Sequence, residues 1–260
     1  MKMNIFDRFP AGGLAVACIL AMLGLSETAR GQVAFARAAT VLRLEGKARY
    51  SIDNQTWQPL KEGTVFNLGA IVQTAEKARI DILLDDPAAE AKSGGQPGGD
   101  TAGDNQAANV VRVLPNTVLA IDKLTAVRYD SLEEVQLDLR SGQILASARK
   151  LTGKARYEVK VANGVVGVRS GFFKISSNGL VDVSTGSVMA AETIGDGTLV
   201  TKLVSAGKRF DPATGTITDA PPIDAKERSE IKENRSSGAN NSATPPAQRV
   251  PGIGGGFRKY

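Results

Sequence analysis

The chain has 260 residues, 42% of them hydrophobic, and a formal net charge of +5. This is enough apolar material for the core of one domain of ordinary size or of two small ones. Because the chain has no histidine, imidazole bases and histidine-based zinc sites are excluded. The mild positive charge is compatible with anionic envelope polymers or lipid head groups as partners, and by itself says most about solubility.

The first 36 residues have the layout of a secretory signal peptide. Basic residues precede an apolar run over 11–25, and small residues follow it. The run is shorter than the roughly 20 apolar residues that cross a bilayer, so an uncleaved anchor is the alternative. We predict a signal peptide over 1–36 that is cleaved after Ala36, with Gly31 and Ala38 as other cleavage points. The mature chain would be exported to the periplasm or cell surface without an integral membrane span.

The single cysteine, Cys18, lies inside this apolar run. Small residues precede it, as in lipoprotein signals, but Ala15 stands where such signals usually have leucine and the run continues to Leu25. We interpret Cys18 as part of the signal peptide, with lipidation as the alternative. Cleavage after Ala36 would leave no thiolate nucleophile and no disulfide. Nucleic acid is not expected as a partner of an exported protein.

Residues 39–219 have the pattern of an all-β domain. Short runs of apolar and β-branched residues are separated by glycine-containing turns, and within one run Ile80 and Ile82 flank Asp81. Three segments share the form strand, glycine turn, strand, and look like copies of one hairpin unit. We predict many short strands joined by hairpins, in a sandwich or solenoid-like arrangement.

Two segments have too few large apolar residues to be packed in a core. Residues 87–109 consist mainly of Gly, Ala, Pro, Asp, Asn and Gln. They are predicted to be a disordered insertion in a hairpin loop, with a domain boundary as the alternative. Residues 220–260 are rich in Pro, Ser, Asn and charged residues without an apolar period. They are predicted to be a disordered tail, in which one or two helical turns form transiently.

Residues 157–192 are typical of a small β-meander with one irregular strand. Its apolar residues change from even to odd positions along the series Val166, Val168, Phe173 and Ile175. One extra residue at Ser170-Gly171 would place all four side chains on one face of the sheet. We therefore predict a β-bulge at that point. It would turn outward Arg169, Phe172 and Lys174, with Phe172 either exposed or lying under a neighbouring loop.

The sequence predicts no catalytic, cofactor-binding or metal-binding residue. The carboxylate pairs Asp85-Asp86 and Glu133-Glu134 are adjacent in sequence, and neighbours on a strand point to opposite faces, so neither pair can flank one bond as in a glycosidase. The glycine-rich stretches 94–99 and 252–256 lack the preceding strand and following helix of a phosphate-binding loop. A serine–lysine arrangement stays open, and an envelope enzyme is the less favoured alternative.

A cluster of basic residues spans 140–174 and is opposed there by Glu158. One interpretation is a solvated strand face and loop. The other is a docking surface for an envelope protein or an anionic cell-surface polymer, because exposed aromatic and basic residues are common binding anchors. The candidate partner-binding residues are Arg149, Lys150, Lys154, Arg156, Arg169, Phe172 and Lys174.

Several short motifs in 39–219 resemble the FecR family of exported β domains. The most specific, Gly167-Val-Arg-Ser-Gly-Phe-Phe-Lys-Ile175, is similar to the family's G-V-R-G-T-x-F-x-V signature. It departs at Ser170-Gly171, where the family has Gly-Thr. Earlier segments, including 63–74 and 115–121, are similar to family motifs in the same order.

This resemblance implies a module that binds or senses without catalysis. Regulatory members of the family carry a cytoplasmic anti-sigma segment and a membrane helix before this domain, and both together do not fit before residue 39 here. We therefore expect a stand-alone exported domain without the part that contacts a sigma factor. The alternative is an envelope polysaccharide-binding or surface structural protein.

Overall fold

The computed structural model describes residues 34–36, 38–66, 68–84, 109–127, 132–151 and 155–241. Outside these ranges lie most of the predicted signal peptide, nearly all of the predicted insertion, the candidate residue Lys154 and the last part of the predicted tail. Among the described residues, no helix combines the length and the apolar character needed to cross a membrane.

Most of the described chain forms strands, which confirms the all-β prediction. In order they are β1 (Ala34–Ala36), β2 (Ala39–Glu45), β3 (Ala48–Ser51), β4 (Gln58–Pro59), β5 (Val65–Phe66), β6 (Ile71–Thr74), β7 (Arg79–Leu83), β8 (Val110–Val113), β9 (Val118–Val127), β10 (Leu132–Ser141), β11 (Gln143–Ala148), β12 (Arg156–Val161), β13 (Gly164–Ser176), β14 (Val181–Thr193), β15 (Leu199–Ser205), β16 (Lys208–Asp211) and β17 (Thr216–Asp219). The helix α2 (Ala225–Asn241) follows the last strand.

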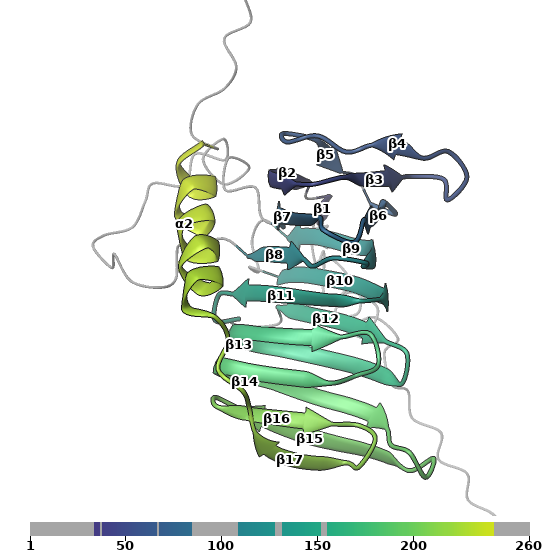
Figure 1. The fold of residues 1–260 in the computed structure, drawn as a ribbon, viewed down its shortest axis with the longest axis vertical. Helices are drawn as coiled ribbons and strands as arrows, with labels where there is room; N and C mark the ends of the chain where they lie inside the picture. The colour runs from purple at the N-terminus through teal and green to yellow at the C-terminus, as the bar shows by residue number, and fades with distance from the viewer. Residues whose placement is uncertain are drawn as a thin grey trace, which may run out of the picture. The chain divides into compact units, whose positions relative to one another are not determined.

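The strands form one hydrogen-bonded sheet that curls until its two halves face each other (Figure 1). The first half runs in the order β4, β3, β6, β9, β10, β12, the start of β13, the end of β14 and β15. The second half runs in the order β5, β2, β7, β8, β11, the end of β13, the start of β14, β16 and β17. The long strands β13 and β14 belong to both halves and so join them.

One large apolar core fills the space between the halves. Because side chains alternate between the faces of a strand, every second residue points into it. Val159 of the first half and Ile144 of the second are both fully buried there. Tyr157 and Phe173 meet edge to face in the same core, with ring centres 6.4 Å apart. The remaining side chains of each strand point to the outer face, part of which α2 covers.

The predicted bulge in β13 is confirmed. Val168 pairs with Val188 and Ser170 with Ser187, so the residue between them, Arg169, has no counterpart on β14. The extra residue therefore lies one position before the predicted Ser170-Gly171. Val166, Val168, Phe173 and Ile175 all join the core, as predicted from their change of parity.

Gly171 meets the backbone requirement of this bulge. Its φ angle is +107°, a conformation that side-chain-bearing residues rarely adopt. A Cβ atom there would lie 1.9 Å from the carbonyl oxygen of Thr185, so the neighbouring strand also excludes a side chain. Glycine at this position is thus required both by the backbone angle and by the close approach of β14.

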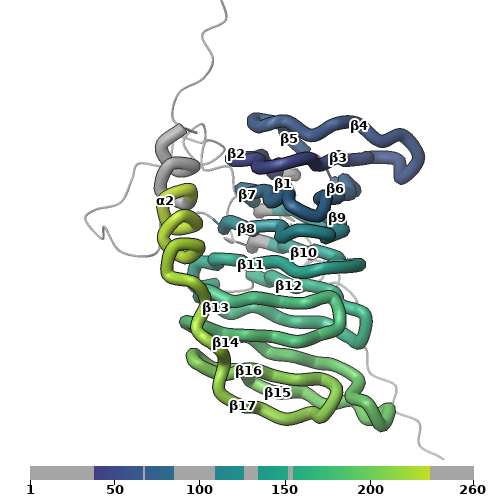
Figure 2. Tube along the Cα trace, viewed as in Figure 1, coloured from purple at the N-terminus to yellow at the C-terminus, as the bar shows by residue number. Residues whose placement is uncertain are grey.

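The chain passes from one end of the stacked strands to the other and then returns. Figure 2 follows this course from the purple strands β2 and β3 to the green strands β15–β17, after which α2 runs back beside the sheet. Helix α2 contacts β7 and β8, and its side chains also reach Leu145 of β11 and Phe172 of β13. A segment near the C-terminus therefore lies against strands more than a hundred residues earlier in the sequence.

The prediction of a disordered tail over 220–260 is wrong for 225–241, which form α2. The Asp224 side chain caps this helix, because its Oδ1 accepts a hydrogen bond from the Lys226 N–H at 2.6 Å. Contacts with the sheet, in place of a local apolar period, stabilise it: Ile231 is fully buried and Glu230 pairs with Arg112.

The segment predicted as an insertion connects β7 and β8, which pair antiparallel as a hairpin. Its last residue, Asn109, is fully buried and belongs to the fold. The Asn109 carbonyl accepts a hydrogen bond from the Leu84 N–H at 2.9 Å, and its side-chain oxygen accepts one from the Arg149 N–H at 3.0 Å. The first bond closes the base of the hairpin, and the second ties it to the residue that follows β11.

Candidate partner-binding surface

The outer face of the second half carries a row of mostly charged residues at matching register. Successive partners across the strands are Asp81, Arg112, Leu145, Lys174, Asp182 and Arg209. Neighbouring side chains on one face of paired strands lie about 5 Å apart, so opposite charges can pair along this row. We call it the charged row. Helix α2 lies over its β7 and β8 end (Figure 1).

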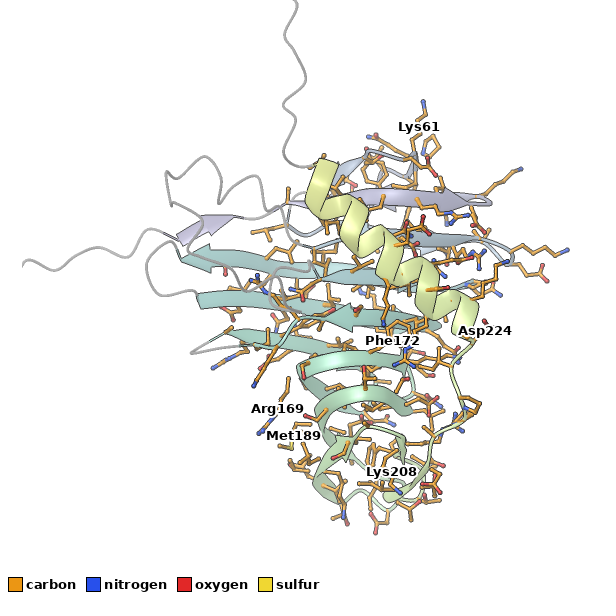
Figure 3. All side chains as sticks on the ribbon, turned by 90° about the vertical axis from the view of Figure 1, so that its left-hand side faces the viewer. Lys61, Arg169, Phe172, Met189, Lys208 and Asp224 are labelled. Carbon is orange, nitrogen blue, oxygen red and sulfur yellow. The ribbon has the colours of Figure 1, made fainter. Side chains whose placement is uncertain are left out.

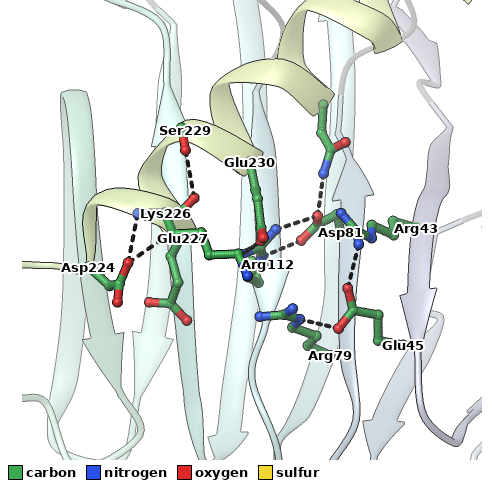
Figure 4. Close-up of polar contacts among 11 residues, drawn as sticks. Arg43, Glu45, Arg79, Asp81, Arg112, Asp224, Lys226, Glu227, Ser229 and Glu230 are labelled. Carbon is green, nitrogen blue, oxygen red and sulfur yellow. Dashed lines mark hydrogen bonds and ion pairs between the residues drawn. The ribbon is translucent and has the colours of Figure 1, made fainter.

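The covered end of the charged row holds a buried ion network, drawn in Figure 4. The Arg112 side chain is 1% exposed and donates from Nε and Nη2 to the two carboxylate oxygens of Asp81, at 2.7 and 2.8 Å. Its Nη1 donates to Glu230 Oε2 of α2 at 2.9 Å. Asn234, one helical turn further on, donates from Nδ2 to Asp81.

Arg112 keeps its positive charge in this network although its side chain is buried. Burial alone would lower the pKa of Arg112, but hydrogen bonds and charge from Asp81, with help from Glu230, outweigh it and raise that pKa. The guanidinium therefore stays charged at any physiological pH. This buried charge is tolerated because each of the three guanidinium nitrogens donates a hydrogen bond to a carboxylate oxygen.

An apolar cluster lies beside the network, also under α2. Its members are Leu83, Val110, Leu145, Phe172 and Ile231, with Leu42 and Ile223 at its margin. Phe172 is 4% exposed, and the Arg228 guanidinium carbon lies 5.8 Å from its ring centre. The bulge turns Phe172 outward as predicted, but the helix covers it (Figure 3). Its predicted role as an exposed anchor is therefore wrong for the structure with α2 in place.

Three of the candidate residues gather at the bulge, and we call them the bulge surface: Lys150, Arg156 and Arg169, all exposed. Leu151 N–H donates to the Arg169 carbonyl at 3.0 Å, which holds the segment after β11 beside the bulge. Arg156 precedes Glu158 by two residues, and Glu158 pairs with Gly167, two residues before Arg169. Both arginines thus lie at the same end of the β12–β13 pair.

The other candidates do not join the bulge surface in the same way. Lys174 pairs with Leu145 and Asp182, so it belongs to the charged row. Arg149 follows β11, is half-buried and is not free of partners. Lys154 lies outside the described residues. The sequence cluster is therefore divided between two places on the molecule.

A shallow groove of about 500 Å³ lies at the β3–β4 hairpin, at one end of the first half. Its lining includes Lys47, Arg49, Trp57 and Pro59. The Arg49 guanidinium carbon stacks 4.5 Å from the Trp57 ring centre, a cation–π contact at the surface. The groove therefore combines an aromatic face with two basic side chains.

A buried carboxyl group lies near the opposite end of the stack. Glu192 of β14 is 0% exposed, and within the described part of the chain neither of its carboxylate oxygens has a hydrogen-bond partner. Burial raises the pKa of Glu192 to about 7. The group is therefore largely protonated in mildly acidic solution and half-ionised near neutrality.

Sequence reasoning missed the members of the buried network. Arg112 and Asp81 each stand between apolar residues of a strand, which is the usual pattern of a solvent-facing polar position. Glu230 lies in a segment without an apolar period. No local signal distinguishes these residues from solvated ones, because their burial depends on a contact between segments 118 residues apart.

The described residues contain no group of three or more acidic or cysteine side chains that could hold a metal ion. No protein-family model and no curated protein matches the chain. Two crystal structures of a candidate anti-sigma factor from Parabacteroides distasonis, at 2.50 and 1.65 Å resolution, are similar to it with a TM-score of 0.39 each. Their identities are 13% and 12%, and the match covers 61% of this chain and 62% of those chains. A likeness at this TM-score assigns no function.

Proposed function

We propose that the protein is a non-catalytic binding or sensing module exported to the cell envelope, resembling the periplasmic domain of the FecR family. The observation that carries the proposal is the β-bulge within the signature-like segment. It places Arg169 at the surface, beside the exposed Lys150 and Arg156. Bulges re-aim side chains at a local cost in ladder hydrogen bonds, so a bulge beneath a basic surface favours a binding role for that surface.

The chemistry of the bulge surface selects an anionic partner. Among the described residues Arg156 forms an ion pair with Glu158 at 3.8 Å, which is too long for a strong hydrogen bond, while Glu134, beside it on β10, pairs with Lys123. Arginine side chains bind carboxylate and phosphate groups in a two-pronged geometry. The partner is therefore an acidic face of an envelope protein or an anionic cell-surface polymer. The lack of histidine supports binding over catalysis, because it removes the commonest general base.

Binding to purified anionic envelope polymer tests this surface. We expect the triple variant Lys150→Gln, Arg156→Gln and Arg169→Gln to bind at least about tenfold more weakly, since three charge-assisted contacts are lost. The matched control neutralises three exposed lysines elsewhere: Lys61, Lys77 and Lys226. Equal losses in both triple variants would show a general charge effect and overturn the assignment to the bulge surface. Unchanged binding would do the same.

Export is tested by the mass of the protein recovered from the cell envelope. Cleavage after Ala36 gives a chain that begins at Arg37 and removes β1, which pairs with β9. Cleavage after Gly31 would leave β1 in place. A chain recovered from the cytoplasm with its N-terminus intact would contradict the proposal.

The groove at the β3–β4 hairpin favours a second candidate function, binding of an envelope polysaccharide. An aromatic ring with adjacent basic groups offers a sugar ring an apolar face and an anionic sugar a charge partner. Trp57 is the only tryptophan in the chain, so its fluorescence reports on this groove directly. Polysaccharide that changes this fluorescence, and that Trp57→Ala fails to bind, would support the second candidate. Binding that is lost with the bulge surface and leaves the fluorescence unchanged supports the first.

A further inference from the structure

The outermost strands of the curled sheet differ in how well they are protected from pairing with another chain. At one end lie β4 and β5, each with two residues, and β4 contains Pro59, which has no backbone N–H. At the other end lie β15, with seven residues, and β17, with four. Short strands and proline are devices that blunt a sheet edge, and β15 has neither.

Exposed apolar side chains gather on the same outer strands and the turns beside them. Among the described residues, the exposed large hydrophobics are Ile52, Val65, Leu68, Leu199, Leu203 and Ile217. Leu199 and Leu203 both belong to β15 and are 71% and 49% exposed. Most large apolar residues of the inner strands are instead buried in the core or under α2. A long, apolar edge strand is a template for another strand.

Along β15, alternation places Val200, Lys202 and Val204 on one face and Leu199, Thr201 and Leu203 on the other, although Lys202 is exposed. Val204 points into the core and is 0% exposed, so Leu199, Thr201 and Leu203 share the outer face. Among the described strands β15 is hydrogen-bonded to β14, which leaves its other edge open. On the outer face of β14, Met189 stands directly beside Leu203.

We propose that β15 pairs antiparallel with β15 of a second copy of this chain, in a symmetric dimer centred on Thr201. In this register Leu199 stands opposite the partner subunit's Leu203, and Leu203 stands opposite the partner subunit's Leu199. Thr201 meets its own copy on the two-fold axis. A two-fold interface of this kind is closed, because each copy presents the same strand to the other.

Self-complementarity favours a second copy as the occupant. The exposed leucines lie symmetrically about Thr201, so one register pairs both of them and joins them to Met189 in a continuous apolar row. Shifting the centre to Lys202 would set two lysines against each other, which is destabilising. In the Thr201 register Lys202 faces the half-buried Val200 of the partner and can lay its aliphatic stem over it.

The oligomeric state of the purified full chain tests this proposal. One strand pair makes an interface below the roughly 1,200 Å² of stable complexes, so we expect a dimer that dissociates on dilution into the micromolar range. The double variant Leu199→Lys and Leu203→Lys should be monomeric at every concentration used. Ile217→Lys, on the other outer strand, should dimerise like the natural chain. A natural chain that stays monomeric, or a dimer unaffected by the double variant, would overturn the proposal.

Cross-linking tests the register independently. In a Cys18→Ser background, Thr201→Cys should be joined to its own copy by a short bifunctional thiol reagent, because directly opposed Cβ atoms lie about 5 Å apart. Thr218→Cys, also exposed but on β17, is the matched control and should react as a monomer. Preferential cross-linking at Thr218 would place the interface on the other strand and contradict the assignment to β15. Loss of the bulge surface leaves both readouts unchanged, so this proposal stands or fails apart from the proposed function.

Discussion

Two arginine–aspartate pairs with the same bonding pattern occupy the two ends of the charged row. In each pair the arginine Nε and Nη2 donate to the two carboxylate oxygens, Arg112 to Asp81 and Arg209 to Asp182. Helix α2 covers the first pair, whose arginine side chain is 1% exposed, whereas the Arg209 side chain is 31% exposed. The same contact therefore exists in a dry and in a partly hydrated setting.

The difference predicts that burial under α2, more than the bonding pattern, decides how much stability is lost when one partner of an ion pair is removed. Under α2, water cannot replace a missing partner, so each charge depends on the others. At the open end, water and salt can solvate a charge that loses its partner. The covered pair also serves as an anchor for α2 through Glu230, a role that the open pair does not share.

The largest effect is expected at the covered pair. Arg112→Met should lower the free energy of unfolding by about 3–5 kcal/mol, because the buried Asp81 then keeps only its hydrogen bond from Asn234 among the described contacts and the half-buried Glu230 loses its ion-pair partner. Urea denaturation at pH 7 measures the loss. The double variant Asp81→Leu and Arg112→Met removes both charges and should recover much of it. A loss of less than about 1 kcal/mol for the single variant would contradict the comparison.

Glu192 extends the comparison to a buried carboxyl group that has no hydrogen-bond partner among the described residues. Because its pKa is raised from 4.5 to about 7, the folded state holds a proton that the unfolded state releases. Its contribution to stability is complete below pH 4.5 and is lost as the pH rises through 7, by at most about 3 kcal/mol.

Glu192→Gln should therefore remove this pH dependence and be the more stable protein at pH 8. Urea denaturation of both proteins at pH 4.5, 6 and 8 measures it. Asp219→Asn, an exposed carboxylate, is the control and should keep the natural profile. Parallel pH profiles for Glu192→Gln and the natural chain would show that this group is not buried as described.

Ile231→Ala tests how firmly α2 is held against the sheet. Ile231 is the fully buried apolar residue among the described side chains of α2, and removing most of its side chain should destabilise the docking of the helix by about 2 kcal/mol. Amide hydrogen exchange should become faster in α2 and unchanged in β16 and β17. Exchange that rises equally in both regions would mean that α2 does not unfold as a separate unit.

The smallest effect is expected at the open pair. Arg209→Met should cost about 1–2 kcal/mol, because the Asp182 side chain, 7% exposed beneath Arg209, loses its ion pair at an end of the row that α2 does not cover. The cost should shrink when denaturation is repeated in about 1 M salt, since a Debye length near 3 Å screens exposed charges. A loss as large and as insensitive to salt as that of Arg112→Met would erase the distinction between the two pairs.

Much of the strand architecture could be predicted because its signals are local. The apolar alternation, the glycine turns and the change of parity between Val168 and Phe173 follow from a side-chain period of two, which the register of β13 and β14 confirms. The candidate site could be predicted only in part. Exposed basic residues near the bulge were found, but their sequence cluster did not reveal that Lys174 belongs to a different face.

The sequence by itself determined an all-β domain, its turns and the place of its bulge to within one residue, because steric rules and alternation act between near neighbours. Tertiary structure decided what is covered. The bonds from Arg112 to Glu230 and from Asn234 to Asp81 join residues 118 and 153 positions apart. Local propensity carries no record of such contacts, so the burial of Phe172 and Arg112 and the formation of α2 depend on burial energy gained only once the sheet has formed.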